Sequence, residues 1–170
     1  MDKLTEKMDQ EVKSTINRQG KYLTFSLAEE EYGIGILKIK EIIGMMPITT
    51  VPQTPDFIKG VINLRGKVIP VTDLRIRFGI DPGDYTERTC IIVVEIEREI
   101  ATLQIGIVVD SVSEVLNITD KDVEDTPTFG IKLKTDYILG MAKIDDGVKI
   151  LLDIDRVLNA EEMAELAKAA

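Results

Sequence analysis

The sequence predicts an all-β protein made of two small barrels. Most apolar residues fall in short β-rich runs, and the second half of the chain repeats the first. Residues 56–74 (DFIKGVINLRGKVIPVTDL) align without gaps on residues 136–154 (DYILGMAKIDDGVKILLDI), 80 positions later, and residues 34–43 resemble residues 105–116 with two residues inserted. Each copy supplies about five strands in about 70 residues, the size of a small closed barrel, and closure would protect aliphatic strand edges from aggregation.

The strands are expected in the following order. Residues 21–28 alternate between the two faces of a strand, the glutamates at 29–31 turn the chain, and residues 32–36 return, so a hairpin opens the first barrel. Seven further β-rich runs follow, namely ITTVP, FIKGVINL, KVIPV, CIIVVEI, ATLQIGIVV, YILGMAKI and VKILLDI.

Helical signals are few. Residues 72–79 predict a short helix capped by Thr72, and residues 159–170 predict a C-terminal helix capped by Asn159, with Glu162 three residues on. The whole is expected to form one domain, and the repeat leaves open whether the barrels exchange strands. The expected parts are a flexible segment 1–20, a first barrel 21–80, a crossover 81–89, a second barrel 90–158 and the C-terminal helix 159–170.

Composition excludes several classes of function. A net charge of −9 disfavours nucleic-acid binding, which draws most of its affinity from Lys and Arg. No apolar run approaches the roughly 18 residues of a membrane-spanning helix, so the chain is expected to be cytoplasmic without direct membrane insertion. The absence of histidine removes Ser-His-Asp and Cys-His catalysis, and no metal-binding or phosphate-binding spacing is present. We therefore expect no enzyme, no cofactor and no metal, with Cys90 buried in its apolar run.

The two copies differ most at the sequence NLRG. Features shared by both copies serve the fold, whereas features present in one copy are candidates for function. Residues 63–66 are Asn, Leu, Arg and Gly in the first copy, but Lys, Ile, Asp and Asp in the second. Gly66 can adopt a positive φ at a hairpin turn and so carry Arg65 to the rim of the barrel.

Glu41 is the natural carboxylate partner for Arg65. The second copy has Glu114 at the equivalent position but Asp145 in place of the arginine, so this pair can form only in the first barrel. One interpretation is an exposed pair worth about 0.2 to 1 kcal/mol. The other is a partly desolvated pair that fixes the register of a docking partner. That partner would bind an aliphatic face made of Ile39, Ile62, Val68 and Ile69.

Four stretches of the chain resemble the CheW family of bacterial chemotaxis coupling proteins. They are YGIGILKIKEI (32–42), TPDFIKGVINLRGKVIPVTDLRIRFG (54–79), IGIVVDSVSEVL (105–116) and DIDRVLNAEEM (153–163). The resemblance covers about residues 20 to 165. It implies two five-stranded SH3-like barrels and an adaptor without catalysis of its own. Such an adaptor would couple the cytoplasmic tips of transmembrane chemoreceptors to the histidine kinase CheA.

The resemblance also assigns residues to two partner surfaces. Glu41 and Arg65 match the paired acid and base of the family. The surface for the regulatory domain of CheA would be formed by Leu23, Ile34, Leu37, Ile39 and Glu41. The surface for the receptor tip would be formed by Gly60, Ile62, Asn63, Arg65, Gly66, Val68 and Ile91.

Two other classes of function remain open. A carbohydrate-binding or nucleic-acid-binding barrel would need exposed aromatic side chains for stacking, and the four Phe and four Tyr are spread along the chain. An enzyme that relies on carboxylates or on Lys67 would need a concave pocket with converging polar groups.

Overall fold

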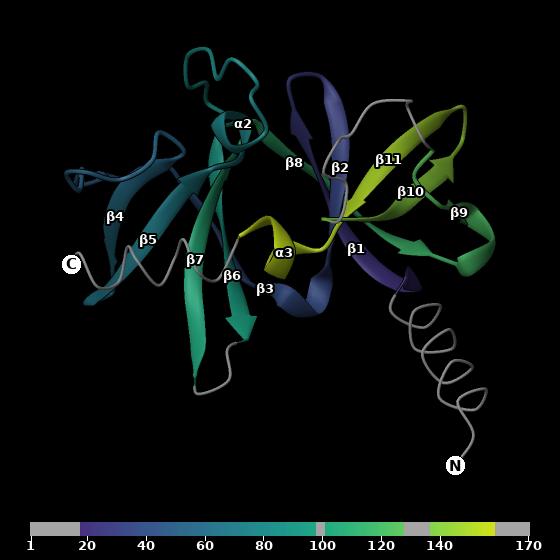
Figure 1. Cartoon of the computed structure of the whole chain (residues 1–170), viewed down its shortest axis with the longest axis horizontal. Coiled ribbons are helices and arrows are strands. Elements are labelled where there is room, and N and C mark those ends of the chain that lie inside the picture. Colours follow the sequence, from purple (N-terminus) through teal and green to yellow (C-terminus); the bar gives the residue numbers. More distant parts are fainter. Residues whose placement is uncertain (1–17, 98–100, 128–136, 159–170) are drawn as a thin grey trace.

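The computed structural model describes residues 18–97, 101–127 and 137–158, and most of these lie in strands (Figure 1). The strands form two sheets, one of five and one of six strands. The prediction of an all-β fold with two small barrels is confirmed. The N-terminal segment up to residue 17 and the predicted helix at 159–170 lie outside the described residues.

The five-stranded barrel holds the NLRG sequence. Its strand pairs are antiparallel except β5 with β7, which are parallel. A bridge between Thr49 and Val61 covers the outer edge of β4 with the segment that follows β3. In spatial order the strands are β3 (Ile39–Gly44), β6 (Cys90–Glu97), β7 (Thr102–Val109), β5 (Lys67–Asp73) and β4 (Ile58–Leu64).

The predicted N-terminal hairpin is confirmed, but it belongs to the six-stranded barrel and not to the barrel that holds the NLRG sequence. The turn between its strands uses Ala28 and Glu29, whose φ values of 50° and 73° are both positive. The additional strand relative to the prediction is a two-residue strand at the edge. In spatial order the strands are β8 (Ser111–Ile118), β1 (Gly20–Leu27), β2 (Glu30–Gly35), β11 (Gly147–Leu152), β10 (Ile138–Ile144) and β9 (Val123–Glu124).

The barrels exchange strands, so a cut within residues 81–89 does not separate them. Residues 21–80 supply β1 and β2 to the six-stranded barrel and β3 to β5 to the other. Residues 90–158 supply β6 and β7 to the five-stranded barrel and β8 to β11 to the six-stranded one. The parallel pairs β5 with β7 and β2 with β11 join the two halves of the chain. Each barrel therefore needs both halves in order to close.

Three apolar clusters form the core, one inside each barrel and one between them. Side chains of a strand alternate between its faces, and β6 shows this clearly. Ile91 and Val93 point into the five-stranded barrel, whereas Ile92 and Val94 join the cluster between the barrels. This double burial explains why β6 reads as a continuous aliphatic run. The interior of the five-stranded barrel holds Ile62, Ile69, Val71, Ile91, Val93 and Val108. The interior of the six-stranded barrel holds Tyr22, Ile118, Val123, Ala142 and Leu151.

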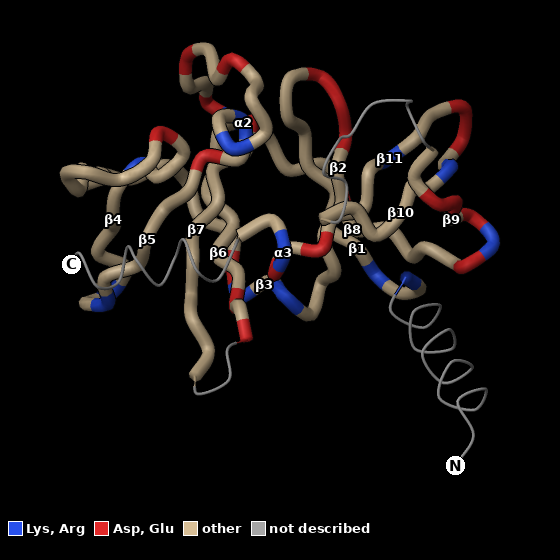
Figure 2. The backbone as a smooth tube through the Cα atoms, in the orientation of Figure 1, with Lys and Arg blue, Asp and Glu red and all other residues tan. Residues whose placement is uncertain are grey.

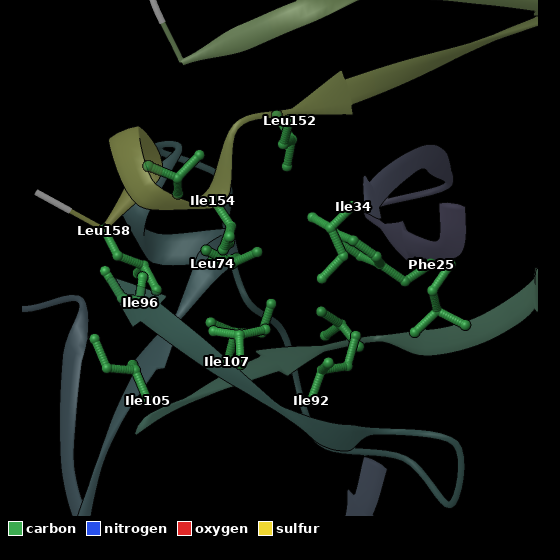
Figure 3. Close-up of a cluster of buried hydrophobic side chains, with 14 of the residues drawn as sticks. Phe25, Ile34, Leu74, Ile92, Ile96, Ile105, Ile107, Leu152, Ile154 and Leu158 are labelled. Atoms are coloured by element: carbon green, nitrogen blue, oxygen red, sulfur yellow. The ribbon is translucent and has the colours of Figure 1, made fainter. Parts of the chain in front are cut away.

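The cluster between the barrels is the largest of the three (Figure 3). Phe25 and Ile34 enter it from the six-stranded barrel, and Ile105 and Ile107 enter from β7. Burying each such side chain contributes roughly 1.5 to 3 kcal/mol. The barrels are consequently held together by core packing.

Two short helices, α2 (Leu74–Arg77) and α3 (Ile154–Val157), follow equivalent strands in the two repeats. The predicted helix after β5 is present, but its N-cap is Asp73 rather than Thr72. The Asp73 carboxylate accepts a hydrogen bond from the Arg75 backbone N–H, while Thr72 is still part of β5 and fully buried. The remaining elements are the 3-10 turns η1 (Ile36–Lys38) and η2 (Asp120–Asp122).

Candidate functional site

The turn between β4 and β5 presents Arg65 at the tip of a two-residue hairpin. Arg65 and Gly66 have φ values of 51° and 85°, and a turn with two positive φ values matches the right-handed twist of the strands. The Asn63 side chain fixes this turn, since its Oδ1 accepts a hydrogen bond of 2.9 Å from the Gly66 N–H. The positive φ predicted for Gly66 is confirmed. The left-handed conformation of Arg65 was not anticipated.

The predicted ion pair between Arg65 and Glu41 is present. Arg65 Nη2 donates to Glu41 Oε1, and the exposed fractions of the two side chains are 70% and 28%. Glu41 lies on β3 and Arg65 follows β4, and these are the two edge strands of the five-stranded barrel. The pair therefore links the edges of the sheet across the mouth of the barrel.

The equivalent turn of the six-stranded barrel has the opposite charge (Figure 2). Asp145 adopts a positive φ of 55° there, as Arg65 does in the first copy. Lys143 forms its ion pair with Glu124 at 2.7 Å. The second copy thus keeps the shape of the turn while replacing its basic tip by two acidic residues, which agrees with a specific role for Arg65.

The residues assigned to the partner surfaces divide by exposure. The side chain of Leu37 is 96% exposed, and that of Val68 is 67% exposed. The exposed set is Leu37, Asn63, Arg65, Gly66 and Val68, and Ile39 and Glu41 are half-buried. The buried set is Leu23, Ile34, Gly60, Ile62 and Ile91. Only the exposed and the half-buried residues can contact a partner directly.

The buried set supports the surface from beneath. Leu23 and Ile34 pack between the barrels, and Ile62 and Ile91 fill the five-stranded barrel. The aliphatic face predicted around Arg65 is corrected accordingly, because Ile62 and Ile69 are both 1% exposed and belong to that interior.

Gly60 also has a structural role. Its φ is 141°, and a Cβ atom there would collide with the carbonyl group of Thr49. The residue therefore lets the segment after β3 approach β4.

Ile42 is an exposed aliphatic residue that sequence reasoning missed. Its side chain is 45% exposed and it follows Glu41 on β3. Strand alternation offered a signal, because Ile43 packs into the barrel interior and Ile42 must then point to the other face. Ile42 therefore lies on the face of β3 opposite to Glu41.

A buried arginine network also escaped prediction. Arg75 is 1% exposed, and its guanidinium donates to Asp73 Oδ2 at 2.8 Å, to Asp110 Oδ1 at 2.9 Å and to the Pro82 carbonyl at 2.6 Å. The hydrogen bonding to Asp73 raises the pKa of the Arg75 guanidinium. Asp110 Oδ2 accepts a hydrogen bond of 2.7 Å from the Ala28 N–H in the hairpin turn of the other barrel. Arg75 is thus the centre of a polar link between the barrels.

We also searched the described residues for metal ligands, membrane-spanning helices, a reactive thiol and exposed aromatic side chains. These residues contain no group of three or more acidic or cysteine side chains that could hold a metal ion. No helix within them is long and apolar enough to cross a membrane. Cys90 is half-buried rather than fully buried as predicted, and burial raises the pKa of its thiol. Among the aromatic side chains of the described ranges, Tyr85 is the exposed one, so stacking of bases or sugars gains no support.

Comparison with known proteins identifies the family. A family model described as the CheW-like domain matches residues 21–162. The chain belongs to the CheW family. It is 43% identical over 143 residues to the chemotaxis protein CheW of Klebsiella aerogenes, and the alignment covers 84% of this chain and 84% of that protein. It is 33% identical over 155 residues to the probable chemotaxis protein CheW of Rhizobium etli, with 91% and 97% covered.

A solved structure agrees with this family. The crystal structure of the scaffolding protein TtCheW from Thermoanaerobacter tengcongensis superposes with a TM-score of 0.74 at 38% identity, covering 85% of this chain and 95% of that one. Membership of the CheW family makes this chain a non-enzymatic chemotaxis adaptor. Its described surface must therefore act by binding.

Proposed function

We propose that the chain links the regulatory domain of the histidine kinase CheA to the cytoplasmic tips of chemoreceptors. The protein works in the cytoplasm and is recruited to membrane-associated receptor arrays. The observation that carries this proposal is the Glu41–Arg65 ion pair, because it sits at a turn whose equivalent in the other repeat is acidic. An adaptor with no chemistry of its own transmits a signal as a coupling free energy between two binding sites.

The kinase surface consists of Leu37, Ile39 and Glu41, supported from beneath by Leu23 and Ile34. The supporting residues lie on β1 and β2 of the six-stranded barrel, whereas Ile39 and Glu41 lie on β3 of the other. The surface therefore spans the junction between the barrels. A related barrel of the kinase could pack on it through aliphatic contacts, with Glu41 fixing the register.

The receptor surface consists of Asn63, Arg65, Gly66 and Val68 on the turn between β4 and β5. Ile62 and Ile91 support that hairpin from the interior of the barrel, and Gly60 lets the segment after β3 pack against it. The exposed Val68 side chain offers apolar area, and Arg65 offers a charge that can discriminate between partners. An α-helical receptor tip could place its apolar stripe against this surface.

The test is a binding titration of the purified chain against a CheA regulatory domain and against a receptor cytoplasmic fragment. We expect wild type to bind both, with micromolar affinities of about −8 kcal/mol sufficing for an array that gains from multivalency. Arg65→Glu should lose at least one contact while keeping its fold. The double reversal of Glu41→Arg with Arg65→Glu should recover part of the loss.

The matched control is Lys143→Glu. Lys143 lies on β10 just before the equivalent turn, has a side chain that is 53% exposed and forms an ion pair with Glu124. The control thus reverses a positive charge two residues before Asp145, the position equivalent to Arg65, and we expect it to leave both contacts unchanged. If folded wild-type protein binds neither partner, the proposal is wrong.

A further inference from the structure

Leu37 is the most exposed large apolar side chain of the described residues, at 96%. It lies on η1, at the edge of a groove of about 570 Å³ that runs between the start of β1, η1 and the start of α3. A cavity of this size falls within the range that takes up an organic ligand or a few apolar side chains. An exposed leucine beside a groove points to an occupant that covers both.

The groove has an apolar floor and a mixed charged rim. Its apolar lining is formed by Tyr22, Ile36, Leu139, Leu152 and Ile154. Lys21, Lys38, Asp153 and Asp155 supply charges of both signs at the rim, and Lys38 pairs with Asp155 at 2.8 Å. The occupant should therefore be amphipathic and carry charges of both signs.

The groove is lined in part by the start of β1. Its lining starts at Gln19, and the Tyr22 hydroxyl donates to the Arg18 carbonyl at 3.0 Å. Residues 1–17 precede this point directly, so a tether of one or two residues connects them to the groove. Such a short tether gives an intramolecular ligand a high effective concentration.

The sequence of residues 1–17 fits this occupant. Leu4, Met8, Val12 and Ile16 recur at every fourth position, a spacing that would place them along one face of a helix. Residues 1–17 also contain three lysines and four acidic residues, which match a rim of both signs. A helix of this length would extend about 25 Å.

We propose that residues 1–17 dock in this groove and cover Leu37. The effect of this docking on kinase binding rests on the proposed function, because Leu37 belongs to the proposed kinase surface. The kinase domain and the N-terminal segment then compete for the same leucine. If the segment occupies the groove nine-tenths of the time, the apparent affinity for the kinase falls about tenfold.

The docking itself can be tested without any partner. In a full chain carrying Cys90→Ser, Leu37→Cys is combined with Leu4→Cys, Met8→Cys or Val12→Cys, and disulfide formation under mild oxidation is followed by non-reducing electrophoresis. We expect at least one pair to form a disulfide within a monomer. Val68→Cys replaces Leu37→Cys in the control, since Val68 does not line the groove. Crosslinks only between molecules, or equal crosslinking in the control, would overturn the proposal.

The competition is tested with a full chain in which two of the four apolar residues of the N-terminal segment are replaced by aspartate. Met8→Asp with Val12→Asp should increase amide exchange at residues 36–38 and tighten kinase binding about tenfold. Gln10→Asp with Ser14→Asp adds the same charge on the opposite face of the expected helix and should change neither. Unchanged exchange in the first variant overturns self-docking, and unchanged affinity overturns the competition. Failure of every form to bind the kinase would refute the proposed function, while the crosslinking result would still decide the docking.

Discussion

Arg65 reaches Glu41, 24 residues earlier in the chain, and so links the two edge strands of the five-stranded barrel. The left-handed φ of Arg65 allows the turn that positions this side chain. The guanidinium stays largely in solvent, whereas the carboxylate is mostly covered. The pair is therefore positioned to shape a surface more than to stabilise the fold.

A double-mutant cycle measures how much the pair stabilises the protein. Glu41→Gln, Arg65→Gln and the double variant are compared by urea unfolding. Because the arginine is 70% exposed, we expect a coupling free energy below about 1 kcal/mol, and a smaller value at high salt. A coupling above roughly 2 kcal/mol would show that the pair is mainly structural and would weaken its assignment to binding.

Arg75 should behave in the opposite way. Arg75→Met removes a buried cation and leaves the carboxylates of Asp73 and Asp110 without a positively charged partner. Breaking a buried pair in this way costs about 3 to 5 kcal/mol, so the free energy of unfolding should fall by that amount. Urea unfolding measures the loss, with Lys143→Met, which removes an exposed cation, as the control.

If Arg75→Met does not yield folded protein, Asp110→Asn gives a milder test. Asp110 is 34% exposed and connects Arg75 to the Ala28 N–H of the other barrel. An amide in its place keeps the shape but loses the charge. We expect an intermediate loss of stability, and stability equal to wild type would contradict a role of this network in joining the barrels.

The internal repeat made much of this fold predictable. Sequence patterns located most of the strands, the helix after β5 and the one turn where the copies differ. They did not identify β3, β8 or α3, and the predicted strand ITTVP is only an isolated bridge at Thr49. The repeat placed Arg65 at the rim of the barrel because a hairpin turn with glycine has few possible geometries. These predictions depend on local patterns, which a single sequence records directly.

Pairings between distant strands could not be predicted in the same way. The parallel pairs β5 with β7 and β2 with β11 depend on contacts between the two halves, and alternation within a strand does not specify them. For the same reason Ile62 and Ile91 were assigned to a surface although they lie inside a barrel. The link from Arg75 to the other barrel was missed because Asp110 lies 35 residues away.

Gly60 is expected to tolerate no side chain. Gly60→Ala would force an L residue to a φ of 141° and drive its Cβ against the Thr49 carbonyl. Strain and overpacking together should lower the free energy of unfolding by about 2 to 4 kcal/mol. Gly44→Ala is the matched control, because no atom lies within 4 Å of its added Cβ and the cost should stay within about 0.5 kcal/mol. Equal stabilities of the two variants in thermal or urea unfolding would contradict this role of Gly60.

Cys90 should react slowly with alkylating reagents in the folded protein. Desolvation of the half-buried thiol disfavours the thiolate and raises its pKa, while a hydrogen bond with the Val112 backbone opposes this in part. At mildly alkaline pH the folded protein therefore holds less thiolate than the unfolded chain, and the thiolate is the reactive form. The rate of alkylation by iodoacetamide should accordingly rise at higher pH in the folded chain than in the chain unfolded by urea.

The raised pKa of Cys90 also affects how the free energy of unfolding depends on pH. A group whose pKa is raised by folding contributes stability that is fully present below its unfolded pKa and is lost as the pH rises through the folded pKa. Cys90→Ser removes this contribution, so its free energy of unfolding should decline less steeply at alkaline pH than that of wild type. The decline should not vanish, because burial also raises the pKa of Tyr22 and Tyr32. Identical alkaline slopes for the variant and wild type would show that the thiol ionises equally well in both states.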